Sequence, residues 1–563
     1  MVPLLLAQLV APPLQNSPVR LPGSGEVEQR PAPEQPPRPI ELDPTPTPPA
    51  PPGSPPPAGG PTNVPAGRQP PVSGLTTYSA AALATILAPC SAIADRQERL
   101  NACAAALTAR LVADGYVNSR VYTRPEPTPG SLEVVEGRIV EIQVSSSDPW
   151  LVRRVKRLLA PLRGQVLLVP RVERELQLLR RQSGIAEVRG NLTRLGSDPS
   201  QAVFVVRLKP GTQPWQGDLS VRNDGSNGSG EFRGVATLLK PSLISRGDTL
   251  LLYGEANASD SPDLGSVISS ISYTLPLTDN LSLTGAFGYS RRNLIELPAP
   301  ADGISTNQYQ GFGQLEWVFR ESLSQRWSLF AAYSGNRSNT YNDGQALPAI
   351  LPESIRSPSS GYLRFGVSGS GFKDRLGLSG NAYLLQGVGA ATSATQRQEL
   401  ATVGIDPGQA TALGGIVSAG WAFAPSWQLN LRAAGQVAFE PLSSAMQFSL
   451  GSDTGLRGLP GQLISGDNGW LGTAETVWTF WQKKSQALQL VPFIGIGGVS
   501  TSLQGVSFSD TVGAGGLLVR WLAGEHWATE LGWVEQFQTN DNLGTWTDWN
   551  LAKGLYAKLQ YRF

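Results

Sequence analysis

The residue with the clearest chemical role to assign is Arg457, in the glycine-rich segment TGLRGLPGQLISGDNGWLGTAE (residues 454–475). A guanidinium group presents five N–H donors in a fixed fork that matches a carboxylate. In a flexible segment poor in charge, such a group can fix the loop to an acceptor elsewhere in the fold. Asp467 and Gly469 in the same segment are expected to form a turn. Arg457 and Gly458 are therefore the first candidate site residues.

No other combination of residues suggests catalysis or cofactor binding. His526 is the only histidine, so a second histidine for a metal site is missing, and no catalytic triad is evident. Beside Trp527 it is interpreted as part of an aromatic membrane belt. Runs such as GIGG lie in strand context and not before a helix, which argues against phosphate binding. We predict no enzyme activity, no cofactor, no metal and no nucleotide.

The two cysteines of the chain, Cys90 and Cys103, lie in one short segment. In an oxidising compartment they could form a disulfide. Two buried thiols are the alternative, because spacing in the sequence does not show whether the Cα atoms come within about 7 Å.

The composition points to a membrane barrel. Charged residues make up 16% of the 563 residues, below the usual quarter, yet no window has the roughly 20 apolar residues of a membrane helix. Alternating strands dilute their apolar residues in this way. A large soluble β protein remains the alternative. The net charge of +1 gives no indication of nucleic-acid binding.

The chain begins with two segments that are not expected to fold into a core. Residues 1–11 resemble the apolar part of a signal peptide without its basic start, so they are either a truncated signal segment or an ordinary apolar N-terminus. Residues 12–74 are rich in proline and are expected to form an extended, disordered linker.

Two small α/β modules are expected next, at residues 75–144 and 145–211. In each module, two segments with helical apolar spacing come before segments that alternate like paired strands. In the first module the second helix stops at Gly115, which suits a helix C-terminus. Two successive units of this kind indicate a tandem repeat.

The remaining residues, 212–563, are expected to form an antiparallel transmembrane β-barrel. Segments of about ten residues alternate apolar and polar, as in WQLNLRAAGQVAF (residues 427–439), and the segments are separated by turn residues. The length of this region suits about 16 strands. The chain ends in KGLYAKLQYRF, in which Tyr561 and Phe563 mark a final barrel strand with an aromatic end.

Several motifs resemble the outer-membrane transporters of two-partner secretion, the family that secretes and activates haemolysins and adhesins. Gly115-Tyr116 and Glu136-Gly137-Arg138 are similar to the signature of the family's periplasmic POTRA modules. VRNDGSNGSGEFRGVATLLKPSLISRGDTL (residues 221–250) is similar to its opening hairpin. Arg457-Gly458 is similar to the tip of the long sixth extracellular loop, which folds into the barrel lumen. Ordinary roles stand beside these: a helix stop and core aromatic for Gly115-Tyr116, and a solvated strand residue for Arg138.

One motif departs from the family pattern. The acceptor for the loop arginine is usually an aspartate within Phe-x-Asp-x-Gly, but here the motif reads Phe493-Ile-Gly495-Ile-Gly497. Either Arg457 pairs with another acceptor in the lumen, or the loop is held more loosely.

The resemblance implies a protein translocator of type V secretion. Its POTRA modules would recognise a secreted, β-helical exoprotein, and the barrel would export it. The other implied partners are outer-membrane lipid and, through the C-terminal strand, the barrel-assembly machinery; the modules would lie in the periplasm. A barrel-assembly insertase and a passive porin are the alternatives.

Overall fold

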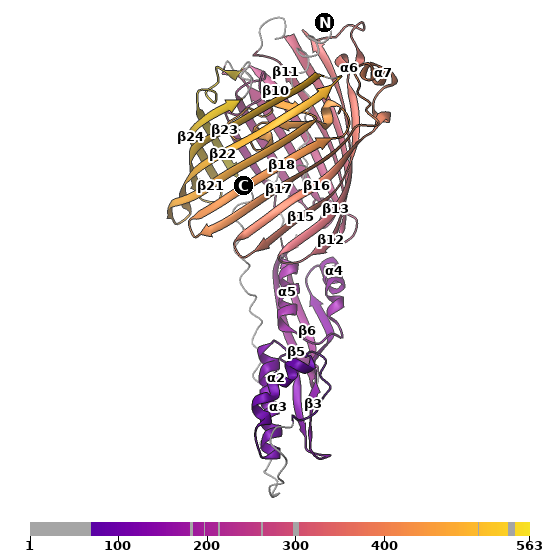
Figure 1. The fold of residues 1–563 in the computed structure, drawn as a ribbon, viewed down its shortest axis with the longest axis vertical. Coiled ribbons are helices and arrows are strands. Elements are labelled where there is room, and N and C mark those ends of the chain that lie inside the picture. The colour runs from indigo at the N-terminus through magenta and orange to yellow at the C-terminus, as the bar shows by residue number, and fades with distance from the viewer. Residues whose placement is uncertain are drawn as a thin grey trace. The chain divides into compact units, whose positions relative to one another are not determined.

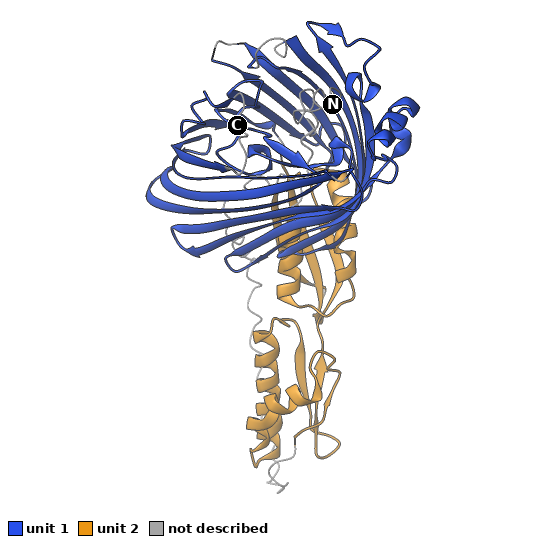
Figure 2. Ribbon diagram, turned by 45° about the horizontal axis from the view of Figure 1, so that its top comes forward, with its two compact units in different colours: residues 1–35, 213–563 blue, residues 36–212 orange. Residues whose placement is uncertain are grey.

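The computed structural model describes residues 69–180, 184–195, 198–211, 214–260, 263–296, 303–504, 506–538 and 546–563. The expected signal segment (1–11) and all but the last residues of the expected linker (12–74) lie outside these residues. The described chain divides between two compact units (Figures 1 and 2), one holding the small modules and one holding the barrel.

The first module is a three-stranded sheet with two helices. Its elements are β1 (Val72–Ser73), α2 (Ala80–Ser91), α3 (Arg96–Ala113), β2 (Arg120–Arg124) and β3 (Ser131–Val135). The sheet has the order β1-β3-β2, so β2 is an edge strand. Side chains of Ser79 and Asp95 cap the first turns of α2 and α3, which is what these residue types do at a helix start. Both expected helices are confirmed.

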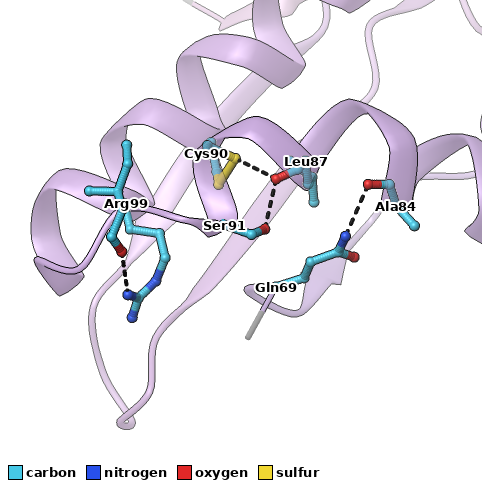
Figure 3. The surroundings of a disulfide bond; sticks show 8 residues. Gln69, Ala84, Leu87, Cys90, Ser91 and Arg99 are labelled. Atoms are coloured by element: carbon cyan, nitrogen blue, oxygen red, sulfur yellow. Dashed lines mark hydrogen bonds between the residues drawn. A yellow bond between two sulfur atoms is a disulfide. The ribbon is translucent and has the colours of Figure 1, made fainter. Parts of the chain in front are cut away.

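A disulfide bond joins the two helices of the first module. Cys90 in α2 and Cys103 in α3 are linked across a Cα–Cα distance of 5.2 Å, which is ordinary for a disulfide. Figure 3 shows its surroundings, where the Arg99 guanidinium donates to the carbonyl oxygen of Ile93 at 2.8 Å. The disulfide and this bond both hold the connection between α2 and α3 close to the helices.

The second module contains β4 (Arg138–Ser145), α4 (Pro149–Leu159), η1 (Ala160–Leu162), α5 (Val169–Arg180), β5 (Ile185–Leu195) and β6 (Asp198–Pro210). Its sheet has the order β4-β6-β5, and β4 runs parallel to β6. The expected boundary after residue 144 is therefore wrong for β4, which belongs to the second module. Alternation shows which residues of β4 lie on each face of a sheet, but not which strand β4 pairs with. The sequence therefore gives no reason to assign β4 and β3 to different modules.

The barrel is closed by sixteen long antiparallel strands in the described part of the chain, as expected. They are β7 (Gln216–Arg222), β8 (Phe232–Pro241), β9 (Thr249–Ala258), β10 (Leu264–Pro276), β11 (Leu281–Asn293), β12 (Ile304–Glu321), β13 (Gln325–Asn342), β15 (Ser359–Lys373), β16 (Leu376–Gly387), β17 (Thr411–Ala424), β18 (Trp427–Ala438), β21 (Asn468–Lys483), β22 (Gln486–Leu503), β23 (Val506–Ala523), β24 (Trp527–Gln538) and β25 (Leu555–Arg562). The last strand, β25, pairs with the first, β7.

Short elements lie between some of the barrel strands. They are β14 (Gln345–Ala346), α6 (Glu353–Arg356), η3 (Gly389–Ala391), α7 (Ala394–Thr402), η4 (Ser444–Met446), β19 (Phe448–Leu450), η5 (Ser452–Thr454) and β20 (Ile464–Gly466). No helix within the described ranges is long and apolar enough to span a membrane.

Each barrel strand has an apolar face and a face of mixed character. In β18, Leu431 is 45% exposed on the outside, whereas Gln436 on the other face is 4% exposed. Exposed apolar residues on every second position suit a lipid-facing surface. Aromatic residues gather near the two-residue turns; the rings of Trp427 and Trp478 stack at 5.2 Å. Such aromatic residues are typical of a membrane interface.

Candidate functional site

The candidate site is the segment between β18 and β21, residues 439–467, which we call the lumen loop. Strands β19 and β20 pair with each other to form a small hairpin within it. Its leucines pack among inward-facing residues of β21–β24, including Val499, Val512 and Val534. Four leucines of the loop belong to this cluster and are at most 6% exposed: Leu450, Leu456, Leu459 and Leu463. A fifth buried leucine, Leu442, lies in a smaller cluster with Leu385 and Met446. The lumen loop is therefore part of the largest apolar cluster of the barrel.

Glycines of β22 make room for two of these leucines. A Cβ atom at Gly495 would lie 2.8 Å from Cδ2 of Leu456, and one at Gly497 would lie 2.9 Å from Cδ2 of Leu450. Both distances are shorter than real Cβ contacts allow. The motif that carries an aspartate in the family pattern here forms a flat surface for the leucine side chains. Phe493, in the same motif, lies with its ring 5.8 Å from the Arg457 guanidinium.

Arg457 pairs with two carboxylates of the barrel wall. It contacts Glu530 on β24 at 2.5 Å and Glu475 on β21 at 3.2 Å. Arg520 on β23 contacts the same two residues, at 2.7 Å and 3.4 Å respectively. All four side chains are at most 15% exposed. Arg457, Glu475, Arg520 and Glu530, the Arg457 cluster, thus form a closed ring of alternating charge, and Arg457 uses acceptors other than position 495.

A second cluster, with the opposite polarity, holds the other side of the loop. Arg233 on β8 contacts Asp453 of the lumen loop at 2.5 Å and Glu255 on β9 at 2.6 Å. Its side chain is 2% exposed, and Tyr253 also donates to Glu255. We call Arg233, Glu255 and Asp453 the Arg233 cluster. The loop contributes the cation at one cluster and the anion at the other.

Gly458 is fitted to the barrel wall. Its φ is +88°, in the region that favours glycine, and an added Cβ would lie 2.2 Å from Cγ1 of Val534. The Gln536 side chain donates to its carbonyl oxygen at 3.1 Å. A residue with a side chain could therefore not occupy this place without moving the loop away from β24.

The expected turn at Asp467 and Gly469 is only partly correct. Asp467 connects β20 to β21, accepts a hydrogen bond from Gln447 at 2.9 Å and donates through its backbone to Thr501. Gly469 lies in β21 itself, where an added Cβ would lie 2.1 Å from the ring of Phe448. A glycine is needed here because the loop approaches the strand closely. The frequency of glycine in turns does not distinguish this role from turn formation.

In the first module, Gly115 and Tyr116 follow the end of α3; Tyr116 packs against the module core, and the carbonyl oxygen of Gly115 accepts from Val169 of the second module at 3.1 Å. Gly115 has a φ of +94°, and Tyr116 donates through its backbone to Leu111 at 2.8 Å, the pattern of a helix C-terminal cap. The Tyr116 ring packs edge-on against Tyr78. Burial, followed by the hydrogen bond to Asp114, raises the pKa of Tyr78 to about 12. These contacts fit the interpretation of Gly115-Tyr116 as a helix stop followed by a core aromatic residue.

Glu136, Gly137 and Arg138 lie where the two modules meet. The Glu136 carboxylate accepts from the backbone and hydroxyl of Thr76, both at 2.6 Å, at the start of the first module. Gly137 accepts from Leu167 of the second module at 2.8 Å. Arg138 opens β4 and donates to the carbonyl oxygen of Gly164 at 3.0 Å. This signature therefore joins the modules.

The C-terminal residues close the barrel. Phe563 and Gly217, next to the start of β7, exchange two backbone hydrogen bonds of 3.0 Å. The ring of Tyr561 lies 6.1 Å from that of Phe563 and 5.8 Å from that of His526. His526 lies among these aromatic residues, in agreement with its interpretation as a belt residue.

Sequence reasoning missed the partners of the lumen loop. Glu475, Arg520 and Glu530 each alternate with outward apolar residues, so their strands already placed them on the inner face. A buried arginine needs a carboxylate, and carboxylates on inner faces after the loop are few. The alternation of these strands thus carries the signal, whereas the family motif points to position 495. Asp453 and Arg233 are far apart in the sequence and gave no such signal.

A closed sixteen-stranded barrel with an apolar exterior, a loop packed inside and two α/β modules defines an outer-membrane transporter with POTRA modules. A family model, the haemolysin secretion/activation protein ShlB/FhaC/HecB, matches residues 201–515. The chain belongs to this family and is an outer-membrane transporter of two-partner secretion.

Solved structures share the fold. CdiB from Escherichia coli is 17% identical with a TM-score of 0.62, over 91% of this chain and 93% of that chain. CdiB from Acinetobacter baumannii is 16% identical with a TM-score of 0.57, over 90% of each chain. BamA from Haemophilus ducreyi lacking POTRA domains 1–3 is more distant, at 13% identity and a TM-score of 0.51, over 89% of this chain and all of that chain. No curated protein matches the sequence.

Proposed function

We propose that the two modules bind an extended exoprotein and that the client then passes through the barrel while the lumen loop moves aside. The observation that carries this proposal is the attachment of the loop, which is buried against β21–β24 and paired with wall charges at two clusters. A pore wide enough for a polypeptide needs a closure when no client is present. Contacts between a loop and a wall, unlike covalent closure, are reversible.

The edge strands of the modules are suited to binding an unfolded client. β2 is an edge strand of the first sheet and β5 is an edge strand of the second. An extended peptide can add to such an edge through backbone hydrogen bonds, which require little of its sequence. We propose a β-helical client, because a chain that folds into strands outside the cell is extended in the periplasm, and its folding outside can drive export.

A disulfide between the loop and the wall tests whether the loop must move. A Cβ at Gly458 would lie 3.4 Å from Cβ of Val534, close to the 3.5–4.5 Å of disulfides. Val534→Cys removes the Cγ1 atom that obstructs a side chain at position 458. Gly458→Cys combined with Val534→Cys should stop export when oxidised and restore it on reduction; the reduced double variant and the Val534→Cys single variant in oxidant are the matched controls. Export at the wild-type level by the fully oxidised double variant would show that the client does not need the loop to move.

An assembly factor for other barrels is the second candidate function. One observation favours it: β25 and β7 share five residue pairs, whereas β11 and β12 share thirteen. A short seam could open and offer strand edges to a new barrel. Ser220 and Gln560 are directly opposite across this seam. Locking them as a cysteine pair should stop the insertion of other barrels if the seam serves their assembly, and should leave client export through the lumen intact.

The C-terminal strand provides a further proposed partner contact. Because β25 ends in exposed Phe563 beside Tyr561, we propose that the barrel-assembly machinery reads this strand before the barrel closes. Phe563→Ser should lower the amount of inserted barrel and leave the export rate per inserted molecule unchanged. An unchanged amount of inserted barrel would contradict this role.

A further inference from the structure

The second module carries a positive charge that the remainder of the chain lacks. Residues 138–211 contain fourteen Lys and Arg against six Asp and Glu, a net charge of +8, whereas the whole chain has a net charge of +1. An asymmetry of this size between parts of one chain indicates an anionic partner.

The exposed face of α4 concentrates this charge. Arg153, Lys156 and Arg157 are exposed and follow the spacing i, i+3, i+4, which places them on one side of the helix. The opposite side is buried in the module core through Leu151 and Val155. The apolar face is therefore committed to the module, and the basic face can make a peripheral, electrostatic contact without insertion.

The sheet of the module offers a second basic surface. Arg189, Arg207 and Lys209 are exposed on β5 and β6, at positions that alternate with residues buried beneath the helices. This surface has the same charge as α4, so charge alone does not distinguish the two.

Trp150 distinguishes α4 from the sheet surface. It lies in the first turn of the helix, is partly exposed, and its ring is 5.1 Å from the Arg154 guanidinium. An indole beside cationic side chains is typical of helices that lie at a phospholipid headgroup layer.

A short segment of chain joins the second module to the first strand of the barrel. β6 ends at Pro210 and β7 begins at Gln216. The five residues between them span at most about 20 Å when fully extended. A module joined by so short a segment to a membrane strand can reach phospholipid headgroups, whereas an acidic client is not tethered to the membrane in this way.

We propose that the α4 face, formed by Arg153, Lys156 and Arg157, binds anionic phospholipid headgroups of the periplasmic leaflet. Each basic residue near an anionic membrane surface strengthens attachment about fivefold. Replacing all three should therefore lower the ratio of docked to undocked module about a hundredfold. The contact holds the module against the leaflet and leaves its sheet surface available.

The test uses the full chain in lipid nanodiscs with a donor dye on Gln165→Cys, an exposed position after α4. Both native cysteines are in the disulfide, so labelling is specific. Energy transfer to an acceptor lipid should be higher in discs with about one third phosphatidylglycerol than in phosphatidylcholine alone, and salt at about 0.5 M should remove the difference, because anionic surfaces are screened.

The variants then assign the surface. Glutamine at positions 153, 156 and 157 should remove the dependence on phosphatidylglycerol. The matched control carries glutamine at 189, 207 and 209, which removes the same charge from the sheet surface and should keep that dependence. Equal energy transfer in both lipids, or loss in the control and not in the α4 variant, would overturn the proposal. So would an α4 variant that keeps lipid proximity but loses salt-sensitive binding of an acidic peptide, since the face would then be a client site.

Discussion

Replacing Arg457 with glutamine should loosen the lumen loop without releasing it. Arg457 makes charged contacts with Glu475 and Glu530, but Arg520 contacts both carboxylates as well. The variant therefore does not strand a buried charge, which would cost about 3–5 kcal/mol. The loss is nearer to one charged hydrogen bond, about 2 kcal/mol. This corresponds to about a thirtyfold rise in the ratio of undocked to docked loop.

The apolar contacts of the loop are larger than this loss. Four leucines of the loop, at 450, 456, 459 and 463, are at most 6% exposed. Burying one leucine contributes about 1.5–3 kcal/mol, so together they contribute about 6–12 kcal/mol. The loop of the Arg457→Gln protein should therefore remain docked most of the time and open more often.

Single-channel recording in planar bilayers measures this directly. The open fraction of Arg457→Gln should rise about thirtyfold, with an unchanged open conductance, because the barrel strands are unaffected. Arg375→Gln is the matched control, since Arg375 lies exposed in a short turn; its open fraction should stay at the wild-type value.

A double-mutant cycle identifies the partner. If Arg457 acts through Glu530, the effects of Arg457→Gln and Glu530→Gln on the open fraction should not add. Strict additivity, or an open fraction for Arg457→Gln equal to that of Arg375→Gln, would refute the idea that this arginine holds the loop.

Three further outcomes are expected. Asp453→Asn should raise the open fraction at the second cluster by a similar factor, because Arg233 keeps its wall partner; recordings that match the wild type would contradict this. Mass mapping without reductant should show Cys90 linked to Cys103 in protein from the outer membrane, and replacing both with alanine should lower the free energy of unfolding of the first module by about 2–4 kcal/mol; two alkylated thiols would disprove the bond. Deleting residues 75–210 should leave a conducting barrel that exports no client, and continued export would rule out a receptor role for the modules.

The sequence predicted the architecture because its signals are local. Alternation along each strand shows the lipid-facing residues, and helical spacing shows the helices. The identity of a strand's partner is not local information, so the sequence predicts β4 as part of the first module although it pairs with β6 of the second. The signature at Glu136-Gly137-Arg138 was found by resemblance, but its position at the junction of two modules depends on contacts with Thr76 and Leu167.

The site was predicted only in part, for the same reason. Arg457 stood out because charge is rare around it, and Gly495 because it breaks a known motif. The acceptors Glu475 and Glu530 lie on strands separated by β22 and β23, and only the closed barrel shows how near they are. Asp453 meets Arg233 across 220 positions of sequence; no spacing rule connects such residues.

Both clusters leave the wall charges paired when the loop departs. Arg233 keeps its contact with Glu255. Glu530 keeps its contact with Arg520 and lies directly opposite Lys558 of the neighbouring strand β25. A single buried ion pair is difficult to open because opening it leaves an unpaired buried charge. Removing the loop avoids most of this cost, since each wall charge keeps a partner. What holds the loop is then mainly the burial of its leucines in the surface that Gly495 and its neighbours leave open. An extended client with apolar side chains can replace such contacts one by one, whereas it could not replace a unique carboxylate–guanidinium pair. The glycine at the usual aspartate position is thus consistent with a loop that closes tightly and still yields to an unfolded chain.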